Sequence, residues 1–437
     1  MDRAQLQHPA WPVWRKIAFR FFFFLFFLQI APVYWPGINL PPFSTINDAY
    51  AAAIDWLVNQ ANAAVFHVRD QLVPLNGSGD TSFSWAQELF FLSVATIGCL
   101  LWTILDRGRR SYETADYWLR TFLRYFLILV SFSYGSSKLF ALQMPYPSQS
   151  MMATRLGDLL PMRLSWMFFG YSTSYQAFGG VLELMVGCLL LYRRTVTAGL
   201  LLGFAVYFNV MMLNLGYNIP VKLFSIHYAF YCAYLLAYQY PRLAGFFIHN
   251  RPVQAYAPFE PVYAQRWKRI ARITAKSLFI LLIGIGPLIG AWSQYNTEAS
   301  EPAPRPFNGV YHITLFSVNG APMPLAHGDS RRWNDIIFEK GNRGSIGCND
   351  TSIRQRYGRA HFSFETDTLK RKIVLRQYDD DYELHDLCEL HYELPDAEHA
   401  RMHTVLGDDS LYMEMARSDH RFPLAENKFQ WLSEQPD

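Results

Sequence analysis

The sequence predicts an all-α, polytopic membrane bundle of about seven transmembrane helices, followed by a C-terminal antiparallel all-β domain. The 437 residues are 51% hydrophobic, yet the mean hydropathy is only +0.02, so the average combines two unlike parts. Long apolar segments fill the chain up to about residue 293. Short alternating segments bounded by turn residues begin at residue 307, and this change of period marks a change of fold.

Seven apolar segments are long enough to cross a membrane. A spanning helix needs roughly 20 mostly apolar residues, because the hydrocarbon layer is about 30 Å thick. The predicted helices cover 17–35, 85–105, 117–139, 174–192, 196–214, 222–240 and 270–292. The first resembles a signal peptide, but it runs into the bulky Tyr34 and Trp35 rather than a small-residue cleavage site. We therefore expect it to be retained.

The basic residues alternate from loop to loop, and this alternation predicts the orientation. Short cytoplasmic loops are enriched in Lys and Arg. Such residues gather before the first helix and after the second, fourth and sixth: Arg3, Arg15, Lys16, Arg20, Arg107, Arg109, Arg110, Arg193, Arg194, Arg242, Arg251, Arg266, Lys268, Arg269 and Arg272. The opposite loops hold few: Arg69, Arg155, Arg163 and Lys222. We expect an inner-membrane protein with a cytoplasmic N-terminus and a periplasmic C-terminal domain.

The connections between the helices add three expected elements. Apolar positions at helical spacing predict an amphipathic outer helix over 44–72, with Ser44 and Thr45 as N-caps after Pro41 and Pro42. In the loop 141–173, the short apolar stretch 164–171 predicts an interfacial or re-entrant helix, and 243–269 forms a cytoplasmic linker. The resulting parts are 1–116 (helices one and two), 117–242 (a four-helix core), 243–293 (linker and last helix) and 294–437 (β domain).

Residues 294–306 form a linker, and the segments after them read as short strands. Alternation over 310–316 is followed by Asn319 and Gly320, a hairpin-type dipeptide. Further expected strands are 335–339, 344–348, 352–357, 361–365, 372–377, 387–393, 403–406 and 410–416. Their regular spacing predicts an antiparallel barrel or sandwich. The opening segment 308–311 and the hairpin ladder resemble a lipocalin-type barrel, which would either hold a ligand or be filled by side chains.

Composition excludes several classes of site. A net charge of +3 does not indicate a nucleic-acid partner, and no haem, iron–sulfur, flavin or nucleotide motif is present. The five cysteines form no CxxC pair or zinc-type cluster, so we expect no metal site. Cys348 and Cys388 lie in the β domain, where an extracytoplasmic location would permit a disulfide between them.

Polar side chains within the apolar segments are the candidate functional residues. Such groups are costly in a bilayer and are tolerated mostly where they face the interior of a bundle. Five of them fall between the middle of the membrane and its outer surface: Lys138, Glu183, Asn209, Asn214 and His227. We expect them to converge on one cavity open to the outside. Alternatively, Glu183 pairs with Lys138 or Asn209 only to hold the bundle, and Lys138 only reaches for the interface.

Residues 117–240 resemble the DoxX family of small four-helix membrane proteins. The residues that carry the resemblance are YGSSKLF at 134–140, QMP at 143–145, GGVLEL at 179–184, Gly187, and LLLYRRT at 189–195. The resemblance implies a four-helix bundle formed by the third to sixth helices. It also implies an association with membrane redox complexes, such as thiosulfate:quinone oxidoreductase subunits, and with oxidative-stress partners. Lys138 and Glu183 match the family pattern.

Two kinds of function follow from these residues. In the first, the chain is a subunit of a quinone-linked oxidoreductase, in which Glu183 exchanges a proton and His227 relays it. Lys138 or Asn209 would hold a quinone carbonyl, Tyr134 and Asn214 would complete the binding site, and a redox partner protein would supply or accept electrons. In the second, the chain is non-catalytic: it binds or transports a lipid or another apolar small molecule, or it is a scaffold for an extracytoplasmic partner.

Overall fold

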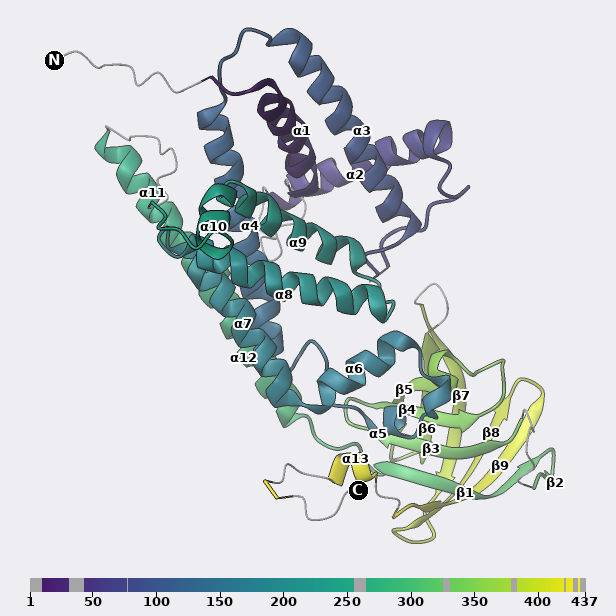
Figure 1. The fold of residues 1–437 in the computed structure, drawn as a ribbon. Coiled ribbons are helices and arrows are strands. Elements are labelled where there is room, and N and C mark those ends of the chain that lie inside the picture. The colour runs from purple at the N-terminus through teal and green to yellow at the C-terminus, as the bar shows by residue number, and fades with distance from the viewer. Residues whose placement is uncertain are drawn as a thin grey trace. The chain divides into compact units, whose positions relative to one another are not determined.

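The computed structural model describes residues 10–30, 43–76, 78–254, 265–324, 331–378, 383–419, 422–426 and 431–432. The chain divides into two compact units: residues 1–144 with 173–293, and residues 145–172 with 294–437 (Figure 1). The first unit is helical and the second contains the β-sheet. Several expected features lie outside the described residues: the end of the first span (31–35), Pro41 and Pro42, Arg3, and the linker residues 255–264.

The first unit contains a helix at each of the seven segments that the sequence predicts. Its helices are α1 (Val13–Ile30), α2 (Phe43–Ala61), α3 (Ser82–Leu105), α4 (Glu113–Leu139), α7 (Thr173–Leu191), α8 (Val196–Gly216), α9 (Lys222–Ala237), α10 (Tyr240–Phe247), α11 (Arg266–Phe279) and α12 (Gly286–Ser300). In the described part of the chain, four helices are long and apolar enough to cross a membrane: α3, α7, α8 and the continuous helix Arg266–Ser300. These four helices indicate a membrane protein.

The amphipathic helix expected over 44–72 is shorter than the sequence predicts. It begins at Phe43, so Ser44 and Thr45 lie inside its first turn rather than at the N-cap. After a π-helical turn it ends before His67, which has the left-handed φ of 49°. The side chain of Asn62 accepts a hydrogen bond from Val68 N (2.9 Å) and donates one to Arg69 O (2.9 Å). These bonds divert the backbone from the helix although the apolar spacing continues.

Helices α4, α7, α8 and α9 pack around one another, each touching the next, and α9 also touches α4 (Figure 1). The α4–α7 contact is close because it is made through glycines. A Cβ added at Gly180 would lie 2.5 Å from Leu139 N and 2.7 Å from Gly135 O. Backbone contact of this kind brings the side chains that flank it on both helices within reach of one another. Helix α1 packs on α3 and contacts α4.

The second unit is built on a closed, antiparallel barrel of eight strands. They are β1 (Gly309–Val318), β3 (Trp333–Glu339), β4 (Arg343–Cys348), β5 (Ala360–Asp367), β6 (Lys372–Tyr378), β7 (Leu384–Glu393), β8 (His399–Leu406) and β9 (Asp409–Arg417). Each pairs with the next, and β9 returns to β1; the short β2 (Ala321–Pro322) extends the turn after β1. Buried side chains that include Trp333, Phe338 and Met413 form its core. The barrel alternative is therefore correct, and this core is filled by side chains.

One expected strand is absent from the barrel. Residues 352–357 form a turn that leads into the 3-10 helix Arg356–Gly358, and Tyr357 has a φ of 69°. The Ser352 backbone N and hydroxyl both donate to Asp350 Oδ1, at 2.9 and 2.6 Å. Such side-chain bonds to the local backbone favour a turn over a strand. Alternation of apolar and polar residues is therefore not sufficient to make this segment pair.

The possible disulfide between Cys348 and Cys388 is not formed. Cys348 ends β4 and Cys388 lies in β7, so two strands separate them in the sheet, and both are buried free thiols. Burial raises the pKa of each thiol to about 11. Both cysteines are therefore neutral packing residues at neutral pH.

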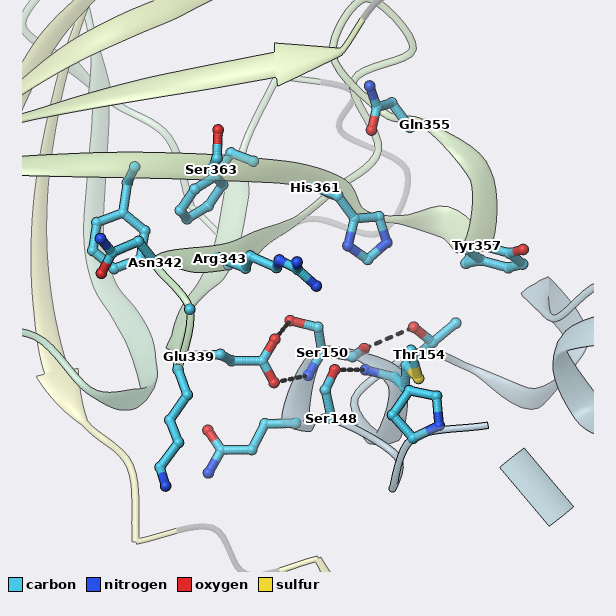
Figure 2. Close-up of a pocket in the computed structure, with 18 of the residues that line it drawn as sticks. Ser148, Ser150, Thr154, Glu339, Asn342, Arg343, Gln355, Tyr357, His361 and Ser363 are labelled. Atoms are coloured by element: carbon cyan, nitrogen blue, oxygen red, sulfur yellow. Dashed lines mark hydrogen bonds between the residues drawn. The ribbon is translucent and has the colours of Figure 1, made fainter. Parts of the chain in front are cut away.

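The connection between α4 and α7 folds as part of the second unit. It contains α5 (Gln149–Met152) and α6 (Pro161–Tyr171), the latter close to the helix that the sequence predicts over 164–171. Ser150 fastens it to β3, because its backbone N and its hydroxyl donate to the two oxygens of Glu339, at 3.1 and 2.7 Å (Figure 2). Ser345 of β4 donates to the Ser150 hydroxyl at 2.7 Å.

The α4–α7 contact can be tested with a matched pair of glycine variants. Gly180→Ala forces two backbones apart, so we expect it to lower the free energy of unfolding by about 1–3 kcal/mol. Gly179→Ala is the control, because its added Cβ would meet only Lys138 Cδ at 3.9 Å. Alanine is the better helix former, so the control should be neutral or slightly stabilising. Thermal unfolding in mild detergent measures both, and equal effects would contradict the packing described.

Candidate functional site

Glu183 is the most deeply buried ionisable residue of the α7 helix, with 2% of its surface exposed. Lys138, in the last turn of α4, donates a hydrogen bond to Glu183 Oε1 and forms an ion pair with it. The second oxygen, Oε2, is buried and has no hydrogen-bond partner among the described residues. The structure thus makes the Glu183–Lys138 pair that was one of the sequence-based alternatives, and it leaves one carboxylate oxygen available.

Tyrosines from three helices surround this ion pair. Tyr134 of α4 has its ring centre 5.8 Å from Lys138 Nζ. Tyr207 of α8 and Tyr228 of α9 lie close enough to Glu183 to interact with its charge. The ring centres of these two tyrosines are 5.7 Å apart. The Tyr207 hydroxyl is held by Ser131 Oγ at 2.6 Å. All four helices α4, α7, α8 and α9 therefore contribute a polar group to one region of the bundle.

His227 belongs to a different polar group, which joins α9 to α1 and α3. Its Nε2 lies 3.3 Å from Glu88 Oε2, and Gln29 Nε2 donates to Glu88 Oε1 at 2.7 Å. Tyr231 donates to Gln29 Oε1 at 3.0 Å. Gln29 is thus a donor and an acceptor at once, and it links the carboxylate to the phenol. We call Gln29, Glu88, His227 and Tyr231 the Glu88 cluster.

The structure does not bring all five predicted polar residues together. Lys138 and Glu183 meet, but no hydrogen bond or ion pair within the described part of the chain joins Glu183 to His227. The Asn209 side chain is exposed on the surface of α8, and no hydrogen bond joins it to Glu183 among the described residues. Asn214 is buried and donates to Val221 O at 3.3 Å, which holds the α8–α9 turn. Tyr134 is 38% exposed beside the ion pair.

Five residues of these clusters were not singled out from the sequence: Gln29, Glu88, Tyr207, Tyr228 and Tyr231. Glu88 and Gln29 are polar residues within predicted spans, and their cost in a bilayer is the signal that could have identified them. Tyr207 and Tyr228 carry a weaker signal, because tyrosine is common in apolar helices. Only the packing of α8 and α9 shows that both approach Glu183.

The Glu183 region offers hydrogen-bonding groups of both kinds to a ligand. The unpartnered carboxylate oxygen can accept a hydrogen bond, and the Lys138 ammonium and the tyrosine hydroxyls can donate. A buried polar atom without a partner is uncommon in proteins and calls for an explanation, such as a bound water, ion or ligand. No group of three or more His, Cys, Asp or Glu side chains suited to a metal ion occurs in the described part of the chain.

Comparison with known proteins gives one short similarity. No family model matches the chain, and no solved structure matches it. An uncharacterized protein of Bacillus subtilis (strain 168), YwoB, is 31% identical to this chain over 84 residues. The match covers 19% of this chain and 54% of the relative, so the chain spans about half of the relative's length. A similarity of this extent does not assign the chain to a family.

The Glu183–Lys138 pair can be tested by a double-mutant cycle. Lys138→Met leaves a buried carboxylate without its counter-ion, so we expect it to lower the free energy of unfolding by about 3–5 kcal/mol. Adding Glu183→Leu should recover much of this loss, because the charge itself is then gone. Asn209→Leu, at an exposed position of α8, is the neutral control. Additive effects of the two single variants would show that the pair is not coupled.

Proposed function

We propose that this protein is an integral membrane component of a quinone-linked redox system and that its bundle binds a quinone head group beside Glu183 and Lys138. The observation that carries the proposal is the unpartnered, buried Oε2 of Glu183. This oxygen can accept a further hydrogen bond, which a ligand bound beside the ion pair would supply. A quinol hydroxyl would donate to this oxygen, and a quinone carbonyl would accept from Lys138 or a tyrosine hydroxyl.

The chemistry expected of such a site is proton exchange. Oxidation of a quinol to a quinone releases two protons and two electrons. A carboxylate beside the hydroxyl would accept the two protons in succession, passing the first on before it takes the second. The Glu88 cluster is the candidate for onward proton transfer, since His227 Nε2 lies 3.3 Å from Glu88 Oε2. The electrons would pass to a partner protein, which would hold the electron-carrying group.

The resemblance of residues 117–240 to the DoxX family supports the same proposal. In it, α4, α7, α8 and α9 form the family's four-helix bundle, and Lys138 and Glu183 occupy the matching positions. We further propose seven spans, from the helices at all seven predicted segments together with the alternation of basic loops. The N-terminus would then be cytoplasmic and the barrel periplasmic, with a likeness to lipocalin-type barrels.

The topology is tested with a matched pair of cysteine variants at open positions. Gly108→Cys lies between α3 and α4, where no atom comes within 4 Å of an added Cβ. Leu369→Cys lies in the β5–β6 turn and is 96% exposed. A membrane-impermeant maleimide added to intact spheroplasts should label the Leu369 variant and not the Gly108 variant. The reverse pattern, or labelling of both in sealed cells, would contradict the proposed orientation.

The quinone proposal is tested by the small-molecule content of the purified protein. We expect an organic extract of the wild type to contain quinone at close to one molecule per chain, by absorbance and mass spectrometry. Glu183→Gln keeps the shape but removes the carboxylate and should lose most of it, because charge-assisted hydrogen bonds contribute about 1.5–3 kcal/mol. Asn209→Leu is the control and should retain the quinone.

Two results would count against this function. If the extract holds only ordinary phospholipid, equally in wild type and Glu183→Gln, the alternative of lipid or amphiphile handling is favoured. If Glu183→Gln fails to accumulate while Asn209→Leu accumulates normally, the carboxylate has a structural role.

A further inference from the structure

The second unit contains a cleft on the outer face of its barrel. Its volume is about 1170 Å³, and it lies between the segment 145–163 and strands β3 to β6. Figure 2 shows side chains from both parts around it, with Arg343 and His361 projecting into the space beside Ser150. The cleft is large enough for a small organic molecule, since ligand sites usually measure about 300–1000 Å³.

Strand register explains which side chains reach the cleft. In the sheet, Arg343 of β4 pairs with Ser363 of β5, and Ser363 pairs with Arg376 of β6. Alternate residues of a strand share a face, so His361 and Ser363 both point outward while Phe362 between them is buried in the core. The barrel therefore presents a row of polar side chains to this cleft.

The charges that line the cleft are mainly basic. Its described lining residues include four basic side chains (Arg163, Lys340, Arg343 and Arg376) and two acidic ones (Glu339 and Glu365). Both carboxylates are engaged: Glu339 accepts two bonds from Ser150, and Glu365 pairs with Arg376 at 2.7 Å. Arg163, Lys340 and Arg343 have no carboxylate partner among the described residues, although Arg163 lies 4.2 Å over the Tyr357 ring.

His361 adds a neutral hydrogen-bonding group. Its Nε2 is buried and has no partner among the described residues. Burial, together with the nearby Arg359 and Arg163, lowers its pKa to about 4, so the ring is neutral at pH 7. Arg359 itself is not available to a ligand, because it donates to Ser345 Oγ at 2.8 Å and pairs with Asp335.

Part of the wall is apolar. Tyr146, Tyr378 and Leu384 line the cleft and are 43%, 57% and 42% exposed. Exposed apolar side chains that border a cluster of unpaired basic groups match a molecule with one charged end and one apolar body.

We propose that this cleft binds a small organic anion, in which an oxyanion group pairs with Arg343 and Lys340 and an apolar body packs against the tyrosines. His361 would contribute one hydrogen bond to the same ligand. Phosphate and carboxylate groups share this chemistry, because arginine donates a planar pair of N–H bonds to either. The proposal is independent of the quinone site, since none of its residues belongs to the helical bundle.

The test is calorimetric titration of the full-length protein in a neutral detergent with phenyl phosphate. We expect saturable binding, at least about tenfold tighter than that of inorganic phosphate. Arg343→Gln and Lys340→Gln remove exposed cations without removing a partner, so both variants should fold. Each should weaken binding of phenyl phosphate by about tenfold or more, the effect of losing one charge-assisted hydrogen bond.

Arg401→Gln is the matched control, because Arg401 is an exposed arginine of β8 outside the cleft, paired with Glu414 at 3.3 Å. Its affinity for phenyl phosphate should equal that of the wild type. Absence of binding, or equal affinity in the Arg343 and Arg401 variants, would overturn the proposal. Inorganic phosphate binding as tightly as phenyl phosphate would also overturn it, because the apolar body would then contribute nothing.

Discussion

The buried ion pair between Glu183 and Lys138 is the interaction on which the helical unit depends. A carboxylate within an apolar bundle is stable only when it is paired, and pairing requires the two helices to lie close together. Gly135 and Gly180 meet this requirement, because they allow the backbones of α4 and α7 to touch. Tyr207 of α8 and Tyr228 of α9 lie near the carboxylate of this pair. The same glycines that permit close packing therefore determine where the polar site can form.

The segment that connects α4 to α7 in the sequence folds with the barrel unit. Helix α4 ends at Leu139 and α7 begins at Thr173, and residues 145–172 between them belong to the barrel unit. Ser150 holds that segment to Glu339 and Ser345. Ser345 in turn accepts a hydrogen bond from Arg359, which is paired with Asp335. The two helices that form the ion pair are thus joined through a segment whose hydrogen bonds are made to the β-sheet.

In the Glu88 cluster, several polar side chains within the bundle serve as hydrogen-bond or ion-pair partners for one another. Gln29 donates to Glu88 and accepts from Tyr231, while His227 approaches the other carboxylate oxygen. Every member comes from an element that must pack against the others, so the network also ties α1 and α3 to α9. Glu183 differs from this pattern, because one of its oxygens is unpartnered. The ligand that we propose would bind at this oxygen.

The sequence by itself determined where the elements lie. Apolar length located the helices, and period-2 alternation located the eight strands of the barrel, because both signals are local and follow directly from the backbone geometry. It also identified Glu183 and Lys138, since a charge in an apolar segment stands out wherever its partner is. The sequence could not determine which way each side chain faces or which elements lie next to one another. Asn209 turned outward, Asn214 bonded a turn, and Cys348 and Cys388 fell on strands that do not meet. The expected strand 352–357 became a turn. Only the tertiary structure decided these points, and it alone brought Gln29 and Glu88 to His227, because the side of an element that faces the interior depends on neighbours distant in the chain.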